Sequence, residues 1–228
     1  MIGGRFIHAL GLGIAPEWRR RSAAERAADM GSFCAADERA GAAGVRSLTY
    51  SSIGMEPGTD LVLWRTAETI DALETAAAAL LRSDLGGWLT VRHAFVGRMG
   101  DSQYVVKPTP QEAGLTGVEP GRYVVVYPFT KSTDWYLQSR ETRQGVMNEH
   151  MRVGRGYPSV RQALAYSFGL DDQDFVVAYE TDDLDAFGDL VRELRGTDSR
   201  RGTVRDTPLL LGIRRPLGEI AALLGAAA

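Results

Sequence analysis

The chain contains two copies of one pattern, spaced by half its length. One copy includes DLVLWRTAETIDALETAAAALL, which begins at Asp60, and the other includes DFVVAYETDDLDAFGDLVREL, which begins at Asp174, 114 positions later. In both copies, an apolar run suited to a buried strand is followed by polar residues. After these, apolar residues recur at the spacing of a helix. Such a repeat constrains the fold strongly, because each half must then be one supersecondary unit.

The match extends to both sides of these segments. VRSLTYSSIG, from Val45, aligns with VRQALAYSFG, from Val160; TVRHAFVG, from Thr90, aligns with TVRDTPLLLG, from Thr203, which is two residues longer. We also pair RFIHALGLGI near the N-terminus with GRYVVVYPFT. Each copy therefore has the order strand, helix, strand, strand, helix, strand, which is the ferredoxin-like arrangement.

The first helix of each copy is expected to be long. We expect it over residues 16–40 in the first copy, with a proline in its first turn, and over residues 133–155 in the second, capped by Ser132 or Thr133. The second helices are expected to begin near Thr69 and Asp183. The predicted class is α+β, a tandem duplication of a ferredoxin-like βαββαβ unit that forms a dimeric α+β barrel.

The repeat also predicts the domain organisation. Residues 1–98 form the N-terminal ferredoxin-like half, and residues 121–228 form the C-terminal half. Residues 99–120, rich in glycine, proline and polar side chains, are expected to link them.

Composition excludes some partners and compartments. The formal net charge of −3 does not favour nucleic acid or an anionic membrane as the main partner. Cys34 is the single cysteine, so no intrachain disulfide is expected, which fits a reducing compartment. No stretch approaches the ~20 apolar residues of a membrane span, and the first arginine cluster follows the N-terminal apolar run, the reverse of a signal peptide. We expect a cytoplasmic protein.

The two copies differ in residues that can carry chemistry. His150 lies near the end of the second long helix, and the first has no histidine in that stretch. Gln162 stands where the first copy has Ser47. The second copy also contains YPFTKSTDWY, from Tyr127, which is dense in groups that exchange protons. These differences place the expected site in the second copy.

Each of these residues also has a purely structural interpretation. His150 can interact with carbonyls at its helix end, Gln162 can face solvent, Tyr127 can be a core aromatic, and Lys131 and Arg195 can be surface charges. A zinc site is poorly supported, because no other histidine or cysteine lies three or four residues from His150. A haem iron needs only one protein ligand, so a lone histidine is compatible with haem.

A series of linked motifs in the second half resembles the chlorite dismutase family, and most closely its coproheme decarboxylase branch. The motifs occur in order and at matching spacing: GRYVVVYPFTKSTDWYL, EHMRVGRGYPSVRQ, SFGLDDQDFVVAYETDDL, LVRELRGTDSRR and RDTPLLLG. The first half matches more loosely, mainly through GTDLVLW. The resemblance implies a tandem ferredoxin-like barrel, assembled into a homo-oligomeric ring that we expect to be a pentamer.

The resemblance also implies roles for the iron-facing residues. His150 would be the proximal haem ligand, and thus the metal ligand. Gln162 would lie on the distal side, where chlorite dismutases carry arginine and coproheme decarboxylases carry glutamine or an apolar residue. Some decarboxylases use a distal histidine at the position of Pro110, so this chain cannot use that version. On general grounds the second nitrogen of His150 is expected to bond a carboxylate or a carbonyl.

Other roles concern the substrate. Tyr127 would be the redox-active tyrosine, Lys131 and Arg195 would hold propionates, and Trp135 would lie near the haem edge. The implied reaction is peroxide-dependent oxidative decarboxylation of coproheme (Fe-coproporphyrin III) to haem b through a tyrosyl radical. Chlorite dismutation, another haem oxidase or peroxidase activity on this fold, and non-catalytic haem binding or sensing remain alternatives, of which Gln162 disfavours the first.

Overall fold

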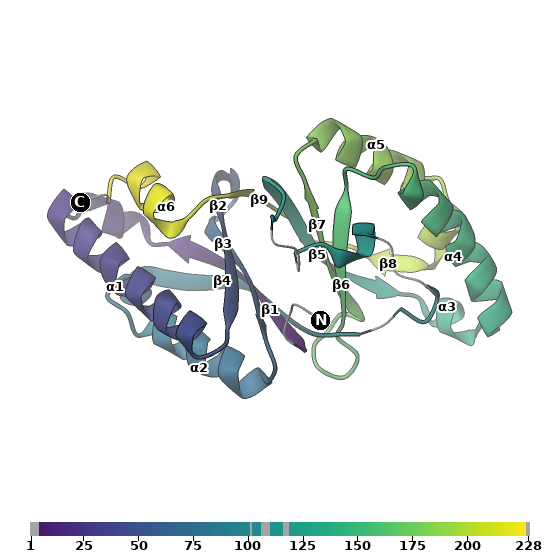
Figure 1. Cartoon of the computed structure of the whole chain (residues 1–228), viewed down its shortest axis with the longest axis horizontal. Helices are drawn as coiled ribbons and strands as arrows, with labels where there is room; N and C mark the ends of the chain where they lie inside the picture. The colour runs from purple at the N-terminus through teal and green to yellow at the C-terminus, as the bar shows by residue number, and fades with distance from the viewer. Residues whose placement is uncertain (1–4, 101, 106–109, 116–118, 227–228) are drawn as a thin grey trace. The chain divides into compact units, whose positions relative to one another are not determined.

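The computed structural model describes residues 5–100, 102–105, 110–115 and 119–226 of the chain. They form two compact units. The first unit comprises Met1–Arg98 with Leu210–Ala228, and the second comprises Met99–Leu209. In each unit the longer helices lie on one face of an antiparallel sheet (Figure 1).

The first unit has a sheet of five strands in the order β4-β1-β3-β2-β9. The strands are β1 (Phe6–Ile14), β2 (Arg46–Glu56), β3 (Thr59–Ala67), β4 (Leu89–Met99) and β9 (Leu210–Arg214). The helices are η1 (Pro16–Arg20), α1 (Ala23–Ala42), α2 (Ile70–Leu81), η2 (Leu85–Trp88) and α6 (Leu217–Leu223), where η marks a 3-10 helix.

The second unit has a sheet of four strands in the order β6-β7-β5-β8. The strands are β5 (Tyr123–Lys131), β6 (Arg161–Tyr166), β7 (Phe175–Thr181) and β8 (Thr203–Arg205). The helices are η3 (Pro110–Ala113), α3 (Thr133–Leu137), α4 (Arg140–Arg155), α5 (Leu184–Arg195) and η4 (Asp198–Gly202).

The predicted duplication is confirmed down to the strand register. Ser47 on β2 is paired with Arg65 on β3, and Gln162 on β6 is paired with Tyr179 on β7. The second helices begin as predicted, with Thr69 and Asp183 as side-chain caps. The α+β class and the tandem ferredoxin-like units are therefore as the sequence predicts.

The two long helices are each interrupted, which corrects the prediction. In the first copy the chain makes η1, and α1 then begins at a capping box in which the Ser22 hydroxyl accepts from the Glu25 N–H and the Glu25 carboxylate accepts from the Ser22 N–H. In the second copy Ser132 caps α3 and Ser139 caps α4. A break in a helix exposes backbone N–H groups at the start of the next helix. Each additional serine accepts a hydrogen bond from one of these groups.

The last strand of the second copy is also interrupted. We expected one strand from Thr203 to Gly212, but β8 pairs with β5 whereas β9 pairs with β2 of the first unit. Pro208 lies between them and has no N–H to donate to a sheet. The compact units therefore have other bounds than the predicted halves: residues 210–228 join the first unit, and the segment predicted as a linker belongs to the second.

The main difference between the units concerns the helix that follows the first strand. In the first unit α1 buries five side chains, including those of Met30 and Phe33, against the sheet. In the second unit α4 has no buried residue. A helix that does not fill the space beneath it leaves room for a ligand, because protein interiors otherwise pack without large voids.

Candidate active site

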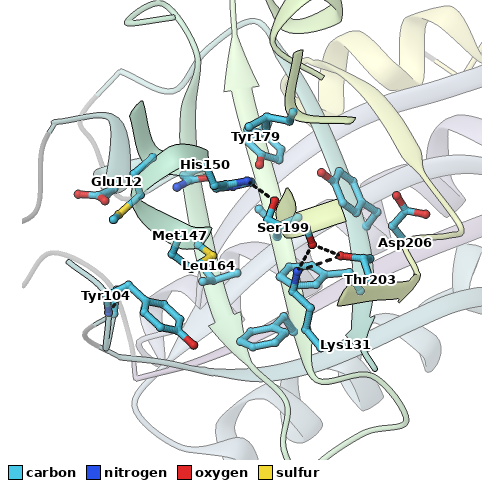
Figure 2. Close-up of a pocket in the computed structure, with 18 of the residues that line it drawn as sticks. Tyr104, Glu112, Lys131, Met147, His150, Leu164, Tyr179, Ser199, Thr203 and Asp206 are labelled. Atoms are coloured by element: carbon cyan, nitrogen blue, oxygen red, sulfur yellow. Dashed lines mark hydrogen bonds between the residues drawn. The ribbon is translucent and has the colours of Figure 1, made fainter. Parts of the chain in front are cut away.

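The second unit encloses a cavity of about 350 Å³ between its sheet and α4 (Figure 2). This volume falls in the usual range of small-molecule sites, about 300–1,000 Å³. Side chains alternate between the two faces of a strand, so every second residue of a strand points to the same side. The sheet wall is made of three such series, from three of the four strands: Tyr127, Phe129 and Lys131 on β5; Gln162, Leu164 and Tyr166 on β6; Phe175, Val177 and Tyr179 on β7.

The opposite wall comes from α4, where Met147, His150 and Met151 line the cavity. These positions recur at helical spacing and so lie on one face of the helix. The Nδ1 atom of His150 lies 3.0 Å from the Ser199 hydroxyl, the dashed contact at the centre of Figure 2. The expectation of a carboxylate or a carbonyl at this nitrogen was therefore wrong, because a serine hydroxyl of η4 holds it.

His150 is half-buried, and this favours the neutral form of its imidazole. Removal from solvent lowers the pKa of His150 to about 4, and the positive charge of Lys131 acts in the same direction. A neutral imidazole has a lone pair on one ring nitrogen, which is the form that binds metal ions. Within the described residues, no group of three or more His, Cys, Asp or Glu side chains is arranged to hold a metal.

Lys131, at the end of β5, is held by the turn that follows α5. Its ammonium donates to the Ser199 carbonyl at 3.0 Å and to the Thr203 hydroxyl at 2.9 Å, as Figure 2 shows. It also lies 4.6 Å from the centre of the Trp135 ring. Burial, with the positive charge of Arg200, lowers the pKa of Lys131 to about 8.

Trp135 is fixed in the cavity wall. It is buried and follows Ser132, the cap of α3. A Cβ atom on Gly202 would come within 2.9 Å of the Trp135 ring, so a larger residue there would displace the indole. The indole and the Lys131 ammonium therefore hold each other at one end of the cavity.

Tyr127 lies within β5, not at its end. The strand continues through Pro128 to Lys131, and Tyr127 is paired with Val177. The pKa of Tyr127 is raised well above its ordinary value, mainly by burial and then by the charge of Tyr179 and a hydrogen bond with it. The phenol is thus held protonated in the resting protein.

Gln162 projects from β6 on the same face as Leu164 and Tyr166, so it faces the cavity. The segment after η3 covers the edge of β6 here, because the Gly114 N–H donates to the Gln162 carbonyl at 2.9 Å. A Cβ atom on Gly114 would lie 2.6 Å from the Gln162 backbone, so this approach requires glycine. The alternative distal position, Pro110, has a side chain outside the described ones.

Three further charged residues, Arg195, Arg200 and Asp206, line the cavity. Arg200 on η4 forms an ion pair with Asp206, and the Arg195 guanidinium lies 4.0 Å from the same carboxylate. The Arg195 side chain is largely exposed, whereas Arg200 and Asp206 are partly buried. The Asp206 carboxylate therefore occupies the place beside both arginines that another carboxylate would take.

All six predicted site residues line this one cavity: Tyr127, Lys131, Trp135, His150, Gln162 and Arg195. The sequence did not single out Ser199, Arg200 or Asp206. All three come from the stretch DSRRGTVRD, which is polar throughout and carries no periodicity that separates cavity-facing residues from solvent-facing ones.

Comparison with known proteins agrees with the geometry. Residues 21–215 match the family model described as chlorite dismutase. The chain belongs to the chlorite dismutase family. It is 33% identical over 189 residues to a coproheme decarboxylase of Mycolicibacterium smegmatis, which covers 79% of this chain and 77% of that protein. A chlorite dismutase of Ideonella dechloratans is 27% identical over 183 residues, covering 77% of this chain and 64% of that protein.

The fold agrees with that of solved members of the chlorite dismutase family. A mutant chlorite dismutase from Candidatus Nitrospira defluvii superposes with a TM-score of 0.89 and 25% sequence identity, covering 99% of this chain and 97% of that one. The matched family region contains the cavity of the second unit, including the full length of α4. The site described above thus lies within the part of the chain that the family shares.

Proposed function

We propose that this chain binds coproheme in the cavity of the second unit and converts it to haem b by peroxide-dependent oxidative decarboxylation. The observation that carries the proposal is the position of His150: its imidazole lies on the cavity face of α4, with Nδ1 hydrogen-bonded to Ser199. The similarity to a coproheme decarboxylase over most of the chain supports the choice of substrate.

The residues present fit a porphyrin. The cavity lies beneath a helix that buries none of its own side chains, and apolar residues such as Met151, Leu164 and Val177 line it. Within the described residues, the Nε2 atom of His150 makes no hydrogen bond, which leaves that nitrogen available as the donor to iron. A single histidine ligand is sufficient for haem.

The cations of the cavity suit a substrate with four propionates. Lys131 at the Trp135 end, and Arg195 with Arg200 near Asp206, are positioned to make charge-assisted hydrogen bonds to carboxylates. Lys131 bonds only to neutral oxygens of Ser199 and Thr203, so its charge has no ion-pair partner at hydrogen-bonding distance within the described residues. We therefore assign Lys131 to binding the reacting propionate, and the two arginines to positioning the other propionates.

Tyr127 is proposed as the residue that is oxidised. When bound, haem supplies, with hydrogen peroxide, the oxidising equivalents that no side chain could provide. Each propionate loses two electrons, one proton and carbon dioxide to become a vinyl group, and one hydrogen peroxide accepts two electrons and two protons to give two waters. Since the Tyr127 phenol is protonated at rest, its oxidation must be coupled to loss of its proton. The tyrosyl radical would then abstract one hydrogen atom from the propionate and become the phenol again. The second electron would pass to the remaining oxidising equivalent of the peroxide as the bond to carbon dioxide breaks and the vinyl group forms.

Gln162 favours this activity over chlorite dismutation. Its side chain is neutral and faces the cavity from β6. A guanidinium would stabilise a departing or rebinding oxyanion by charge and by two parallel donors, which an amide does not provide. We therefore do not propose chlorite as the substrate.

Assembly and location remain part of the proposal. We propose a homo-oligomeric ring, expected to be a pentamer, in the cytoplasm, with a porphyrin and not nucleic acid as its partner. Within the described residues no helix is long and apolar enough to cross a membrane. Light scattering of the purified protein tests the ring directly: a monomer at micromolar concentration would contradict it.

The binding step is tested by the absorption spectrum of the protein with ferric coproheme. We expect His150→Ala to abolish or greatly weaken the bound-haem spectrum while the circular dichroism spectrum stays the same. The matched control is His93→Ala on β4 of the first unit, which should bind like the parent. An unchanged coproheme spectrum for His150→Ala, or its loss for His93→Ala, would refute the assignment.

A further inference from the structure

A chain of hydroxyl groups runs from His150 into the interior of the second unit. The Nδ1 atom of His150 lies 3.0 Å from the Ser199 hydroxyl, which lies 2.9 Å from the Thr197 hydroxyl. The Thr197 hydroxyl in turn donates to the Leu194 carbonyl at 2.7 Å, at the C-terminal end of α5. Ser199 and Thr197 are both buried, so water does not compete for these bonds.

The direction of each hydrogen bond follows from the last one. A carbonyl can only accept, so the single hydroxyl proton of Thr197 is used on Leu194. Thr197 must therefore accept from Ser199, whose own single proton is then used. Ser199 can only accept from His150. The proton of the neutral imidazole must consequently reside on Nδ1, which leaves the lone pair on Nε2.

The chain of hydroxyls also ends without a charge. Its terminus is a backbone carbonyl, and both hydroxyls in it are uncharged. A carboxylate at Nδ1 would draw the imidazole proton toward itself and raise the basicity of the ring. A serine hydroxyl that donates its own proton to Thr197 polarises the imidazole N–H less than a carboxylate does.

The turn that carries Ser199 is fixed at several points. The Ser199 carbonyl accepts from Lys131, and the Asp198 N–H donates to the Glu149 carboxylate at 3.1 Å. The Arg200 N–H donates to the Thr197 carbonyl. Ser199 is thus held against α4 by bonds that do not involve its side chain, which leaves the hydroxyl free to orient the imidazole.

We propose that Ser199 is a positioning residue that fixes His150 as the Nδ1–H tautomer, and that the uncharged Ser199–Thr197 pair makes the ring a weakly polarised ligand. The inference rests on the proposed function only in taking His150 as the haem ligand. With Nδ1 occupied, Nε2 is the donor to iron. Because the chain of hydroxyls contains no carboxylate, the imidazole is a weaker electron donor than a carboxylate-bonded histidine. A weaker donor favours the ferrous state of a bound iron.

The tautomer is tested first in the full chain without haem. The sequence contains three histidines, so nitrogen NMR of protein labelled at histidine gives a simple spectrum. The set of signals that is lost in His150→Ala belongs to His150. At neutral pH we expect the His150 proton on Nδ1. A His150 ring protonated on Nε2 instead, or on both nitrogens, would overturn the inference.

The donor strength is tested with haem b bound, by the iron–histidine stretching band of the ferrous protein in resonance Raman spectra. Ser199→Asp should move the band to higher frequency and lower the midpoint potential, whereas Ser199→Thr, which keeps a hydroxyl, should restore the parent band. Thr203→Val is the matched control, since it removes a Lys131 contact and leaves the chain of hydroxyls intact. A band unmoved in Ser199→Asp would contradict the proposal.

These outcomes are separable from those of the proposed function. If haem b binds through His150 with the expected tautomer but coproheme is not converted, the proposed activity fails and the role of Ser199 stands. If coproheme is converted but His150 is the other tautomer, the role of Ser199 fails and the activity stands.

Discussion

The rings of Tyr127 and Tyr179 lie face to face on adjacent strands of the second unit, with centroids 6.0 Å apart and planes 24° from parallel. Both phenols have a raised pKa, because both are removed from solvent. Tyr179 is in turn paired with Gln162 on β6. Tyr127 itself is paired with Val177, so Tyr179 lies diagonally between the proposed radical site and the proposed distal residue.

Replacing Tyr127 by phenylalanine should separate binding from reaction. Tyr127→Phe keeps the ring in its place beside Tyr179 and removes only the hydroxyl. We expect near-normal coproheme binding and less than about a hundredth of the parent's product, since loss of a group that transfers a proton commonly costs about 10²-fold or more. The control is Tyr123→Phe, at the start of the same strand and outside the cavity lining. Conversion by Tyr127→Phe at close to the parent's rate would remove the tyrosyl radical from the mechanism.

Binding of a carboxylate-rich porphyrin should weaken as the pH rises above 8. The pKa of Lys131 is lowered to about 8, so the free protein loses this charge as the pH passes that value. A bound propionate favours the ammonium, so binding takes up protons at alkaline pH. Loss of one such bond, worth about 1 kcal/mol, corresponds to a factor of about five in affinity.

Fluorescence titration with metal-free coproporphyrin III measures this without interference from iron chemistry. Lys131→Met should bind more weakly than the parent at pH 7 and show a flatter pH profile above 8. The same pH dependence in Lys131→Met and the parent would mean that another group titrates.

Asp206 should weaken substrate binding, because its carboxylate is paired with the two arginines that would bind the substrate. Asp206→Asn frees Arg200 and Arg195 from a partly exposed carboxylate, and exposed ion pairs are worth about 0.2–1 kcal/mol. We therefore expect coproporphyrin III to bind up to about fivefold more tightly, with a smaller change for protoporphyrin IX, which has fewer carboxylates. The control is Asp198→Asn, which removes the exposed pair with Arg201 on the same turn. Weaker binding by Asp206→Asn would show that the carboxylate positions the arginines instead.

Chlorite should give little oxygen with this protein. Gln162 presents a neutral amide to the cavity where a chlorite dismutase presents a guanidinium. An oxygen electrode should record negligible sustained release from the haem-loaded parent and a measurable rise for Gln162→Arg, with Gln162→Leu as the control that stays inactive. Robust oxygen evolution by the parent would assign the chain to the other activity of its family.

Much of the fold could be predicted from the sequence, because a long repeat gives each element twice. Thr69 and Asp183 cap the second helices as expected, and Ser47 and Gln162 hold equivalent places in the two sheets. The breaks at Ser22 and Ser139 were missed because helical spacing continues across them. A local cap can interrupt a helix without disturbing the apolar periodicity on either side.

The site was predicted less completely. His150, with Met147 and Met151 on the same face of α4, has the spacing of an ordinary core-facing helix, and only the structure reveals a cavity beneath it. Ser199 and Asp206 belong to a polar stretch in which no pattern marks a residue as part of a site. Their roles depend on contacts with residues far away in the sequence, which a single sequence does not contain.

The most direct measurement is anaerobic loading of the parent protein with ferric coproheme, followed by stepwise addition of hydrogen peroxide and mass analysis of the porphyrin. We predict successive appearance of the three-propionate intermediate and the two-propionate product haem b, with carbon dioxide released at each step and about one peroxide consumed per propionate. Coproheme that keeps all four propionates, whether intact or bleached, would contradict the proposed activity.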